Sequence, residues 1–458
     1  MTFAVTYGEA GTGNATMARA ETAAASVDVG AVIADRNRYI TDLLPPMPDP
    51  GDDRFQRKML SVMKVNSLSP EGAIAHNWST TCRAPHKWMY LWDGMFQALS
   101  MSHVDPDLAL DYFSAFFQFQ DKASGHLCST IGPPSGLVGG KCSADASVPN
   151  VAMMLLDNYR QKPNLDYLKM AFPKLERYIQ WYRTNRQGPA TAGGKTVTYL
   201  LRWDNAGEAG MDHEQNFCPG NTFWSGGCTS DHFGLDFANY LIYESQAMAK
   251  MAALIGLPDR AAYWTALATN VTKEMDELLW DEETGFYYDM WFNGTLMSMK
   301  TVAGVYPLMV EGMNRTRVEK IHQMLKSPDF WTSVPVPTVA VSTPDFSTDL
   351  DRGPMWQQQN VYIIRGLRLY GYDKDADELK AISLKVVRDY YERWGTVFEF
   401  YDALNTTDPT QTLRKPPHRD VGKCTPGIMG LEGHCGAGGI RDYNFCAGIA
   451  LLWHRGGE

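Results

Sequence analysis

The sequence lacks two features that would place the protein in a membrane or on a nucleic acid. No apolar run reaches the roughly 18 to 20 residues that a membrane-spanning helix needs, and no cluster of basic residues is present. Acidic side chains outnumber basic ones by 52 to 42, which gives a formal net charge of −10. Nucleic acids and anionic membranes attract patches of Lys and Arg. We therefore expect neither as a partner, and no membrane span.

The chain also lacks the cysteine and histidine spacings of a metal site. Its eight cysteines include no CxxC pair, and no histidine stands at zinc-finger distance from them. We therefore expect no bound metal and no other cofactor. Three cysteine pairs lie in segments rich in Gly, Pro and Ser, where loop-closing disulfides are expected. They are Cys128/Cys142, Cys218/Cys228 and Cys424/Cys435. The alternative is a set of unrelated buried thiols.

The N-terminus and the glycosylation sequons bear on localisation. Residues 1–30 are rich in Ala, Thr and Gly but have no compact apolar core of the kind found in signal peptides. We interpret them as a flexible or weakly helical lead, or as the remnant of a processed N-terminus. Six N-x-S/T sequons occur, at Asn14, Asn77, Asn270, Asn293, Asn314 and Asn405. With the cysteines, they predict a secreted protein or one in the lumen of the secretory pathway.

Most of the chain shows the period of amphipathic helices. The clearest case is 235–255, where apolar or small residues recur every three or four positions. Gly256 is expected to end this helix and Pro258 to begin the next, which gives a hairpin with a very short connection. Further helices are predicted over about 54–66, 91–102, 105–121, 148–160, 164–184, 300–311, 315–326, 357–370, 373–392 and 441–453. Short strands are predicted over 196–201 and 285–291.

This pattern predicts an all-α fold, in which around a dozen paired helices form a closed toroid of hairpins. The chain has 458 residues, 44% of them hydrophobic, so it can bury a large core. No linker divides residues 31–458, which we interpret as one domain. Functional groups are expected in the non-helical segments at the helix ends. Four such segments are rich in aromatic residues and glycine: 86–96, 201–217, 351–360 and 396–404.

In these segments an aromatic side chain repeatedly stands next to a carboxylate. Examples are Trp92-Asp93, Trp203-Asp204 and Phe398-Glu399. Sugars are bound by such pairs, because an apolar ring face stacks on the aromatic side chain while the hydroxyls bond to carboxylates and amides. Glu399 is flanked by phenylalanine on both sides, so it should be partly desolvated, which suits an acid–base role.

The charged residues of the four segments also have purely structural interpretations. Asp93 would be a good N-cap for the helix that follows, and Arg352 a good ion-pair partner. Asp212 precedes His213 and Glu214, which is typical of a solvated acidic turn, and Glu399 could face water at a rim. Two carboxylates, one from mid-chain and one near its end, are nevertheless what glycosidic cleavage needs. One protonates the leaving oxygen, and the other activates water on the opposite face of the ring.

Four sequence elements resemble those of glycoside hydrolase family 63 and related (α/α)6-barrel glycosidases. GEAGMD at 207–212 resembles the family's E-S-G-M-D element, and EFYDALN at 399–405 its E-x-Y-D/N-x-x-T/N element. RGPMWQQQNVYIIRGLRLYGY at 352–372 is similar to its R-G-P-x-W segment, and YLWDGMF at 90–96 to its W-D-x-x-F. Order and spacing agree over roughly residues 75 to 455. The resemblance implies an (α/α)6 barrel and a glycosidase.

The resemblance also implies roles for individual residues. The family's general acid corresponds to Asp212 and its general base to Glu399, in an inverting mechanism that needs no metal. Together with the aromatic–carboxylate pattern, it predicts a substrate-binding set. The set is Tyr90, Trp92, Asp93, Trp203, Glu208, Arg352, Gly353, Trp356, Gln359, Asn360 and Tyr401.

The sequence departs from the family around the acid. The aromatic residue that the family has before E-S-G is Gly207 here, and Asp204 is a rival for the acid. The family's Ser-Gln-Pro-Pro element is replaced by SVPN at 147–150. The chain has the size of the short members, which include hydrolases of mannosylglycerate and glucosylglycerate. This implies a small α-glucoside, α-mannoside or glycosyl-glycerate as substrate. The sequence does not indicate the oligomeric state.

Two other functions use the same kind of barrel. Sugar epimerases and isomerases resembling the N-acylglucosamine 2-epimerases rely on pocket histidines for proton transfer. The histidines here are scattered and form no obvious pair near the four segments. A non-catalytic carbohydrate-binding barrel would keep Trp92 and Trp356 but need neither acid. Glu399→Gln separates these functions, because a hydrolase loses turnover while a lectin changes little.

Overall fold

The structure is a computed structural model of the chain, and it describes residues 13–83, 88–132, 142–211, 231–344, 346–412 and 438–457. The chain divides into two compact units, Met1–Arg57 and Lys58–Glu458. Within the described ranges, no helix is both long enough and apolar enough to cross a membrane.

The first unit contains two helices, α1 (Gly13–Ser26) and α2 (Val29–Leu43). Asp28 caps the start of α2, because its carboxylate accepts a hydrogen bond from the N–H of Ala31 at 3.0 Å. Neither helix has a buried residue. The described part of the predicted lead, 13–30, is therefore mostly helical. The boundary between the units falls after Arg57, within α3 (Pro50–Val65).

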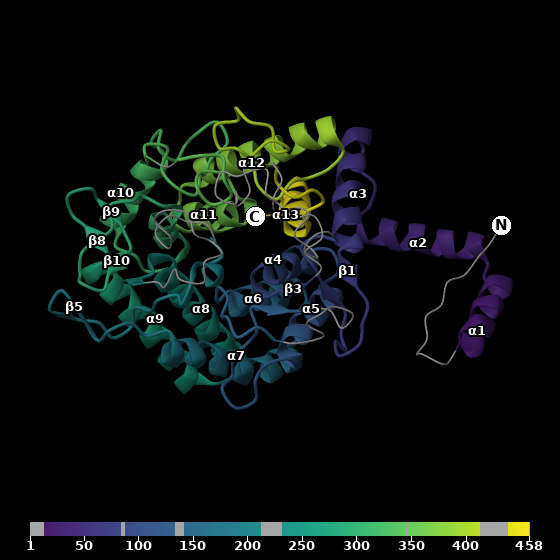
Figure 1. The fold of residues 1–458 in the computed structure, drawn as a ribbon, viewed down its shortest axis with the longest axis horizontal. Coiled ribbons are helices and arrows are strands. Elements are labelled where there is room, and N and C mark those ends of the chain that lie inside the picture. Colours follow the sequence, from purple (N-terminus) through teal and green to yellow (C-terminus); the bar gives the residue numbers. More distant parts are fainter. Residues whose placement is uncertain are drawn as a thin grey trace. The chain divides into compact units, whose positions relative to one another are not determined.

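The second unit is an (α/α)6 barrel, which confirms the predicted toroid of helical hairpins. Its inner ring is formed by α4 (Leu91–Ser102), α6 (Val151–Gln161), α8 (Leu235–Leu254), the 3-10 turn η3 (Tyr306–Met309), α11 (Gln357–Leu369) and α13 (Asn444–His454). Each inner element packs on the next, and α13 closes the ring against α4 (Figure 1). The outer helices are α5 (Pro106–Gln118), α7 (Leu165–Asn185), α9 (Pro258–Leu278), α10 (Arg315–Leu325) and α12 (Asp373–Trp394).

The hairpin of α8 and α9 shows how the sequence sets this alternation. Gly256 has a φ of +76°, a left-handed conformation that glycine adopts without strain. The N–H of Leu257 then bonds back to the carbonyl of Ala252 at 2.8 Å. Pro258 is the first residue of α9, where its fixed φ suits a helix start and its missing N–H is no loss. The predicted end of one helix and start of the next are confirmed.

The N-terminal ends of the inner helices share one face of the barrel, because each hairpin reverses the chain direction. Short antiparallel strand pairs hold the segments that lead into these helices. β3 (Met89–Tyr90) pairs with β4 (Thr130–Ile131) before α4, and β7 (His232–Phe233) pairs with β10 (Met290–Trp291) before α8. The other pairs are β1 (Ser67–Leu68) with β2 (Trp78–Ser79), β5 (Thr191–Ala192) with β6 (Lys195–Thr196), and β8 (Trp280–Asp281) with β9 (Phe286–Tyr287).

One predicted helix, over 300–311, is wrong. The segment forms two 3-10 turns, η2 (Val302–Gly304) and η3. Gly304 and Pro307 both disfavour a regular helix. Gly304 also packs so closely on Phe286 that a Cβ would lie 2.2 Å from its ring. Tertiary packing therefore decides the conformation of this part of the inner ring.

Candidate active site

The N-terminal face of the barrel has an aromatic floor. Trp92, at the start of α4, has its ring centroid 4.9 Å from that of Phe96 and 5.7 Å from that of Tyr240 on α8. Tyr362 on α11 lies 5.5 Å from Phe96 and 6.0 Å from Tyr306 on η3. Four inner elements thus contribute rings to one layer. Trp92 is only half-buried, so part of its indole remains available to a ligand.

Two carboxylates, Asp93 and Glu399, lie on the same face. Asp93 accepts a hydrogen bond from the hydroxyl of Tyr443 at 3.0 Å. Glu399 is buried, and its Oε2 accepts a hydrogen bond from the N–H of Ile440 at 3.4 Å. Burial, followed by the negative charges of Glu399 and Asp93, raises the pKa of the Cys446 thiol well above its usual value. Both carboxylates are therefore within electrostatic range of one thiol on α13.

The backbone of Glu399 is fixed on both sides. Its N–H donates to the carbonyl of Ile440 at 2.9 Å, and its carbonyl accepts from the Cys446 thiol at 3.2 Å. Two residues further on, Tyr401 and Met355 form an antiparallel bridge with hydrogen bonds of 2.8 and 3.1 Å. This bridge brings two of the four predicted segments, 351–360 and 396–404, side by side.

The segment that carries Arg352 bends sharply at Gly353. The φ of Gly353 is +151°, and a Cβ there would lie 2.3 Å from the carbonyl oxygen of Ser347, so only glycine fits. Arg352 itself is buried. Trp356 ends the segment, with its indole N–H on the carbonyl of Leu350 at 2.8 Å. The bend thus leads into Trp356, which stands directly before α11.

The loop that leads to the predicted acid is anchored twice before it reaches the face. Trp203 is fully buried, and its indole N–H lies 3.0 and 3.1 Å from the two oxygens of Asp236. Glu208, in the 3-10 turn η1 (Ala206–Glu208), binds Arg186 with both carboxylate oxygens, at 2.8 Å from Nε and 2.5 Å from Nη2. It also accepts from the N–H of Ala146 at 2.8 Å. These contacts fix the loop from inside the protein.

Gly210 then places the loop against the aromatic floor. Its φ is +71°, and a Cβ there would lie 3.0 Å from Cε2 of Trp92 and 2.9 Å from Cγ2 of Val148. The described loop ends at Met211, and Asp212 lies outside the described residues. The structure therefore brings the residue two positions before Asp212 into contact distance of Trp92.

Two other members of the predicted substrate-binding set use polar atoms within the protein. Asn360 donates to the carbonyl of Pro335 at 2.8 Å, and the hydroxyl of Tyr401 accepts from a backbone N–H at 3.1 Å. Gln359 is buried, and its Oε1 has no hydrogen-bond partner among the described residues. Tyr90 is half-buried in β3. The contacts of these residues with a sugar stay predictions.

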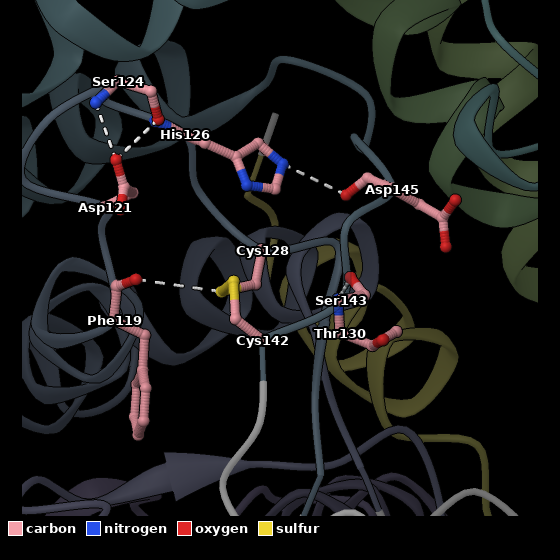
Figure 2. Close-up of a disulfide and its surroundings, with 9 residues drawn as sticks. All are labelled: Phe119, Asp121, Ser124, His126, Cys128, Thr130, Cys142, Ser143 and Asp145. Carbon is pink, nitrogen blue, oxygen red and sulfur yellow. Dashed lines mark hydrogen bonds between the residues drawn. A yellow bond between two sulfur atoms is a disulfide. The ribbon is translucent and has the colours of Figure 1, made fainter.

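A disulfide lies close to His126 and Asp145 (Figure 2). Cys128 and Cys142 are bonded, as predicted. Nearby, the Nε2 atom of His126 hydrogen-bonds to the carbonyl of Asp145 at 3.2 Å. Asp145 precedes the residue whose N–H binds Glu208, so the disulfide loop and the anchor belong to one connected structure. The pairs Cys218/Cys228 and Cys424/Cys435 lie outside the described residues.

The buried acids of α8, Asp236 and Glu244, are not marked by any of the sequence motifs. Burial, reinforced by the charge of Asp289, raises the pKa of Asp236 to about 8, and burial raises that of Glu244 to about 7. Glu244 caps α6, because its oxygens accept from the N–H groups of Ala152 and Met153 at 2.9 Å each. The only sequence signal for Asp236 is an acid in the first turn of a predicted helix. Glu244 lies in the middle of α8, and no sequence signal marks it.

The described residues of this face include a half-buried indole and two carboxylates, from Trp92, Asp93 and Glu399. Such a set can bind a polar ring compound and transfer protons to or from it. Among the residues that the structure describes, no three His, Cys, Asp or Glu side chains are grouped so that they could hold a metal ion.

A comparison with protein-family models identifies the family of the chain. The model described as "Mannosylglycerate hydrolase MGH1-like glycoside hydrolase domain" matches residues 85–407. The chain belongs to this family. The matched range is therefore a glycoside hydrolase domain. The matched range includes the aromatic floor at Trp92, the anchored loop 203–211, the Arg352 segment and Glu399.

Solved structures share the fold of this glycoside hydrolase domain. The GH63 mannosylglycerate hydrolase from Thermus thermophilus in complex with glucose is 21% identical, with a TM-score of 0.67, over 87% of this chain and 99% of that one. Its complex with Tris and D-glycerate gives a TM-score of 0.66 at 20% identity, with the same coverage. Neutral trehalase Nth1 from Saccharomyces cerevisiae gives 0.57 at 14% identity, over 87% of this chain and 79% of that one. At these identities, the likeness shows the fold alone.

A curated relative is more similar over a shorter stretch. An uncharacterized protein from Borreliella burgdorferi is 27% identical over 161 residues, which is 34% of this chain and 34% of that protein. The match thus spans about a third of the relative's length.

Proposed function

We propose that the protein is an inverting α-glycoside hydrolase, with Asp212 as general acid and Glu399 as general base. The observation that carries the proposal is the convergence of three parts of the chain on one face. Glu399 and Asp93 lie within electrostatic range of the same thiol, and Gly210, two residues before Asp212, packs towards Trp92 next to Asp93. Membership of a glycosidase family supplies the reaction class.

In the proposed reaction, the sugar ring lies over Trp92 and its hydroxyls donate hydrogen bonds to Asp93. Asp212 gives its proton to the glycosidic oxygen as the bond from that oxygen to the anomeric carbon breaks. Glu399 takes a proton from a water molecule that attacks the anomeric carbon from the opposite side, so the configuration inverts. The hydrogen bond from Ile440 orients the Glu399 carboxylate. An inverting pair requires roughly 6.5–9.5 Å between the two carboxyl groups.

The substrate we propose is a small α-glucoside or α-mannoside, with mannosylglycerate and glucosylglycerate as the first candidates. The family description names mannosylglycerate hydrolase, and the Thermus thermophilus enzyme has been solved with D-glycerate. Arg352 supplies positive charge that would suit the carboxylate of a glycerate group, since a guanidinium matches a carboxylate in charge and shape.

Glycerate release tests the substrate class. Mannosylglycerate and glucosylglycerate should release glycerate, and both should be compared with trehalose and kojibiose under the same conditions. If neither glycoside yields glycerate, the glycerate proposal is wrong.

The anomer that forms first tests the mechanism separately. NMR spectra recorded during the first turnovers should show the inverted anomer. A retained anomer would contradict the role of Glu399 as a base.

We also propose that the protein works in an oxidising compartment, secreted or in the secretory lumen. The Cys128–Cys142 disulfide supports this, because disulfides persist in such compartments and are rare in the cytosol. Alkylation of the protein isolated from its natural source, followed by mass spectrometry, should find Cys128 and Cys142 unmodified. Full alkylation of both would contradict the proposal.

A further inference from the structure

Asp236 is a buried carboxylate that the proposed reaction does not use. It lies in the first turn of α8 and is 3% exposed. Its two oxygens accept the indole N–H of Trp203, and Oδ1 also accepts the N–H of Phe237 at 2.6 Å. The Trp203 ring stacks on Phe237 with a centroid distance of 3.9 Å and an interplanar angle of 13°. The start of α8 therefore holds Trp203 by both its edge and its face.

A carboxylate is costly at this position. Burial and the charge of Asp289 both work against ionisation of Asp236. The helix start does not depend on Asp236 alone, because Asp289 already satisfies the N–H of Leu235 at 2.7 Å. Asp236 mainly serves Trp203, because the buried indole N–H of Trp203 would lack a hydrogen-bond acceptor without it.

Trp203 begins the loop on which the proposed acid stands. Nine positions separate it from Asp212, and the Glu208 anchor and Gly210 lie between them. Glu208 is bonded to Arg186, and Gly210 packs towards Trp92. Asp204, the residue after Trp203, donates its N–H to Glu208 at 3.0 Å, so a shift of Trp203 would disturb the Glu208 anchor and, through it, the loop that leads to Asp212.

We propose that Asp236 is a positioning residue that holds, through Trp203, the loop bearing the general acid. This inference rests on the proposed function, because it assigns Asp236 an effect on the proton donated by Asp212. Asp236 itself touches no substrate. Its removal should therefore impair protonation of the leaving group more than sugar binding.

The test compares two substrates that differ in their need for an acid. An activated aryl glycoside has a leaving group that needs little protonation, whereas an alkyl or glycerate glycoside needs it. Asp236→Ala should lower kcat on the unactivated glycoside about 10- to 100-fold, because small displacements of a catalytic group cost up to about 100-fold. The activated glycoside should lose less than about threefold.

Two further variants keep the test independent of a folding defect. Trp203→Phe removes the indole N–H together with part of the ring that stacks on Phe237, and it should show the same preference for the activated substrate. Asp236→Asn keeps a carbonyl acceptor, so it should stay within about threefold of wild type on both substrates. Glu244→Gln is the matched control, since it changes another buried carboxylate on α8 that caps α6. It should lower the melting temperature and leave the ratio of the two rates unchanged.

The outcomes separate this inference from the proposed function. Equal losses on both substrates in Asp236→Ala and Trp203→Phe would overturn the positioning role and leave a purely structural one. Asp212→Asn provides the reference. If Asp212→Asn selectively loses the unactivated substrate and the other two variants do not, only the positioning role fails. If Asp212→Asn loses both substrates equally, the acid assignment fails and this inference fails with it.

Discussion

Replacing Glu208 by glutamine should destabilise the barrel although it changes only a few atoms. The carboxylate accepts two hydrogen bonds from Arg186, one from Ala146 and one from the N–H of Asp204 at 3.0 Å. The Glu208 and Arg186 side chains are 1% and 8% exposed. Glutamine has one acceptor oxygen and presents an NH2 group to the remaining donors. Breaking a buried ion pair in this way costs about 3–5 kcal/mol.

This cost translates into a measurable shift of the melting temperature. The second unit, Lys58–Glu458, has 458 − 57 = 401 residues. At about 2.1 cal/mol/K per residue, its unfolding entropy is about 0.84 kcal/mol/K, so a loss of about 4 kcal/mol lowers the melting temperature by about 5 °C. Differential scanning calorimetry at neutral pH measures this shift.

The matched control is Asp107→Asn. Asp107 pairs with Lys162 at 2.7 Å, but the two side chains are 69% and 57% exposed. Exposed pairs contribute little, so this variant should melt close to wild type. If Glu208→Gln shifts the melting temperature no more than Asp107→Asn does, the Glu208–Arg186 pair does not hold the loop, and our account of it is wrong.

Three further predictions concern the same scaffold. Gly210→Ala should cost about 1–3 kcal/mol in urea denaturation, because its positive φ and the nearby Val148 leave no room for a Cβ; an unchanged midpoint would contradict the close packing. Cys128→Ser combined with Cys142→Ser should cost about 3 kcal/mol, as expected for a sequence separation of 14, and a double variant with the same urea midpoint as the oxidised wild-type protein would refute it. Asp236 and Glu244 have folded pKa values of about 8 and about 7, above their ordinary 3.8 and 4.5. Between the ordinary and the raised pKa of each group, the folded state therefore binds more protons than the unfolded state. Their contribution to the free energy of unfolding is fully present below about pH 4 and is lost as the pH rises to about 8. Urea titrations at pH 5 and pH 8 should show a smaller difference for Asp236→Asn than for wild type.

The helices could be predicted where local signals mark their ends. Gly256 and Pro258 separate α8 from α9 through their own backbone preferences, which do not depend on the rest of the fold. The segment 300–311 has the helical period but folds as 3-10 turns, because its packing against Phe286 overrides the pattern. The predicted strand over 285–291 is divided into β9 and β10, which pair with different partners.

The candidate site residues are marked by motifs in the sequence, but the contacts that support them are not. Trp92, Asp93 and Glu399 stand beside aromatic residues in the sequence, which makes them visible as a pattern. The bonds of Trp203 to Asp236 and of Glu208 to Arg186 join residues 33 and 22 positions apart. No local pattern encodes such partners, because they depend on how separate hairpins pack. Trp203 was expected to bind sugar, whereas the structure buries it and occupies its indole N–H within the protein.

The proposed role of Glu399 as general base is tested most directly by the turnover and the sugar affinity of Glu399→Gln. Glutamine has the size of glutamate and keeps an oxygen that can accept the N–H of Ile440, but it cannot take a proton from water. On the glycoside that the wild-type protein hydrolyses, kcat should fall by at least about 100-fold. The dissociation constant from calorimetry and the melting temperature should stay close to wild type. A variant that hydrolyses the same glycoside at the wild-type rate would contradict the account.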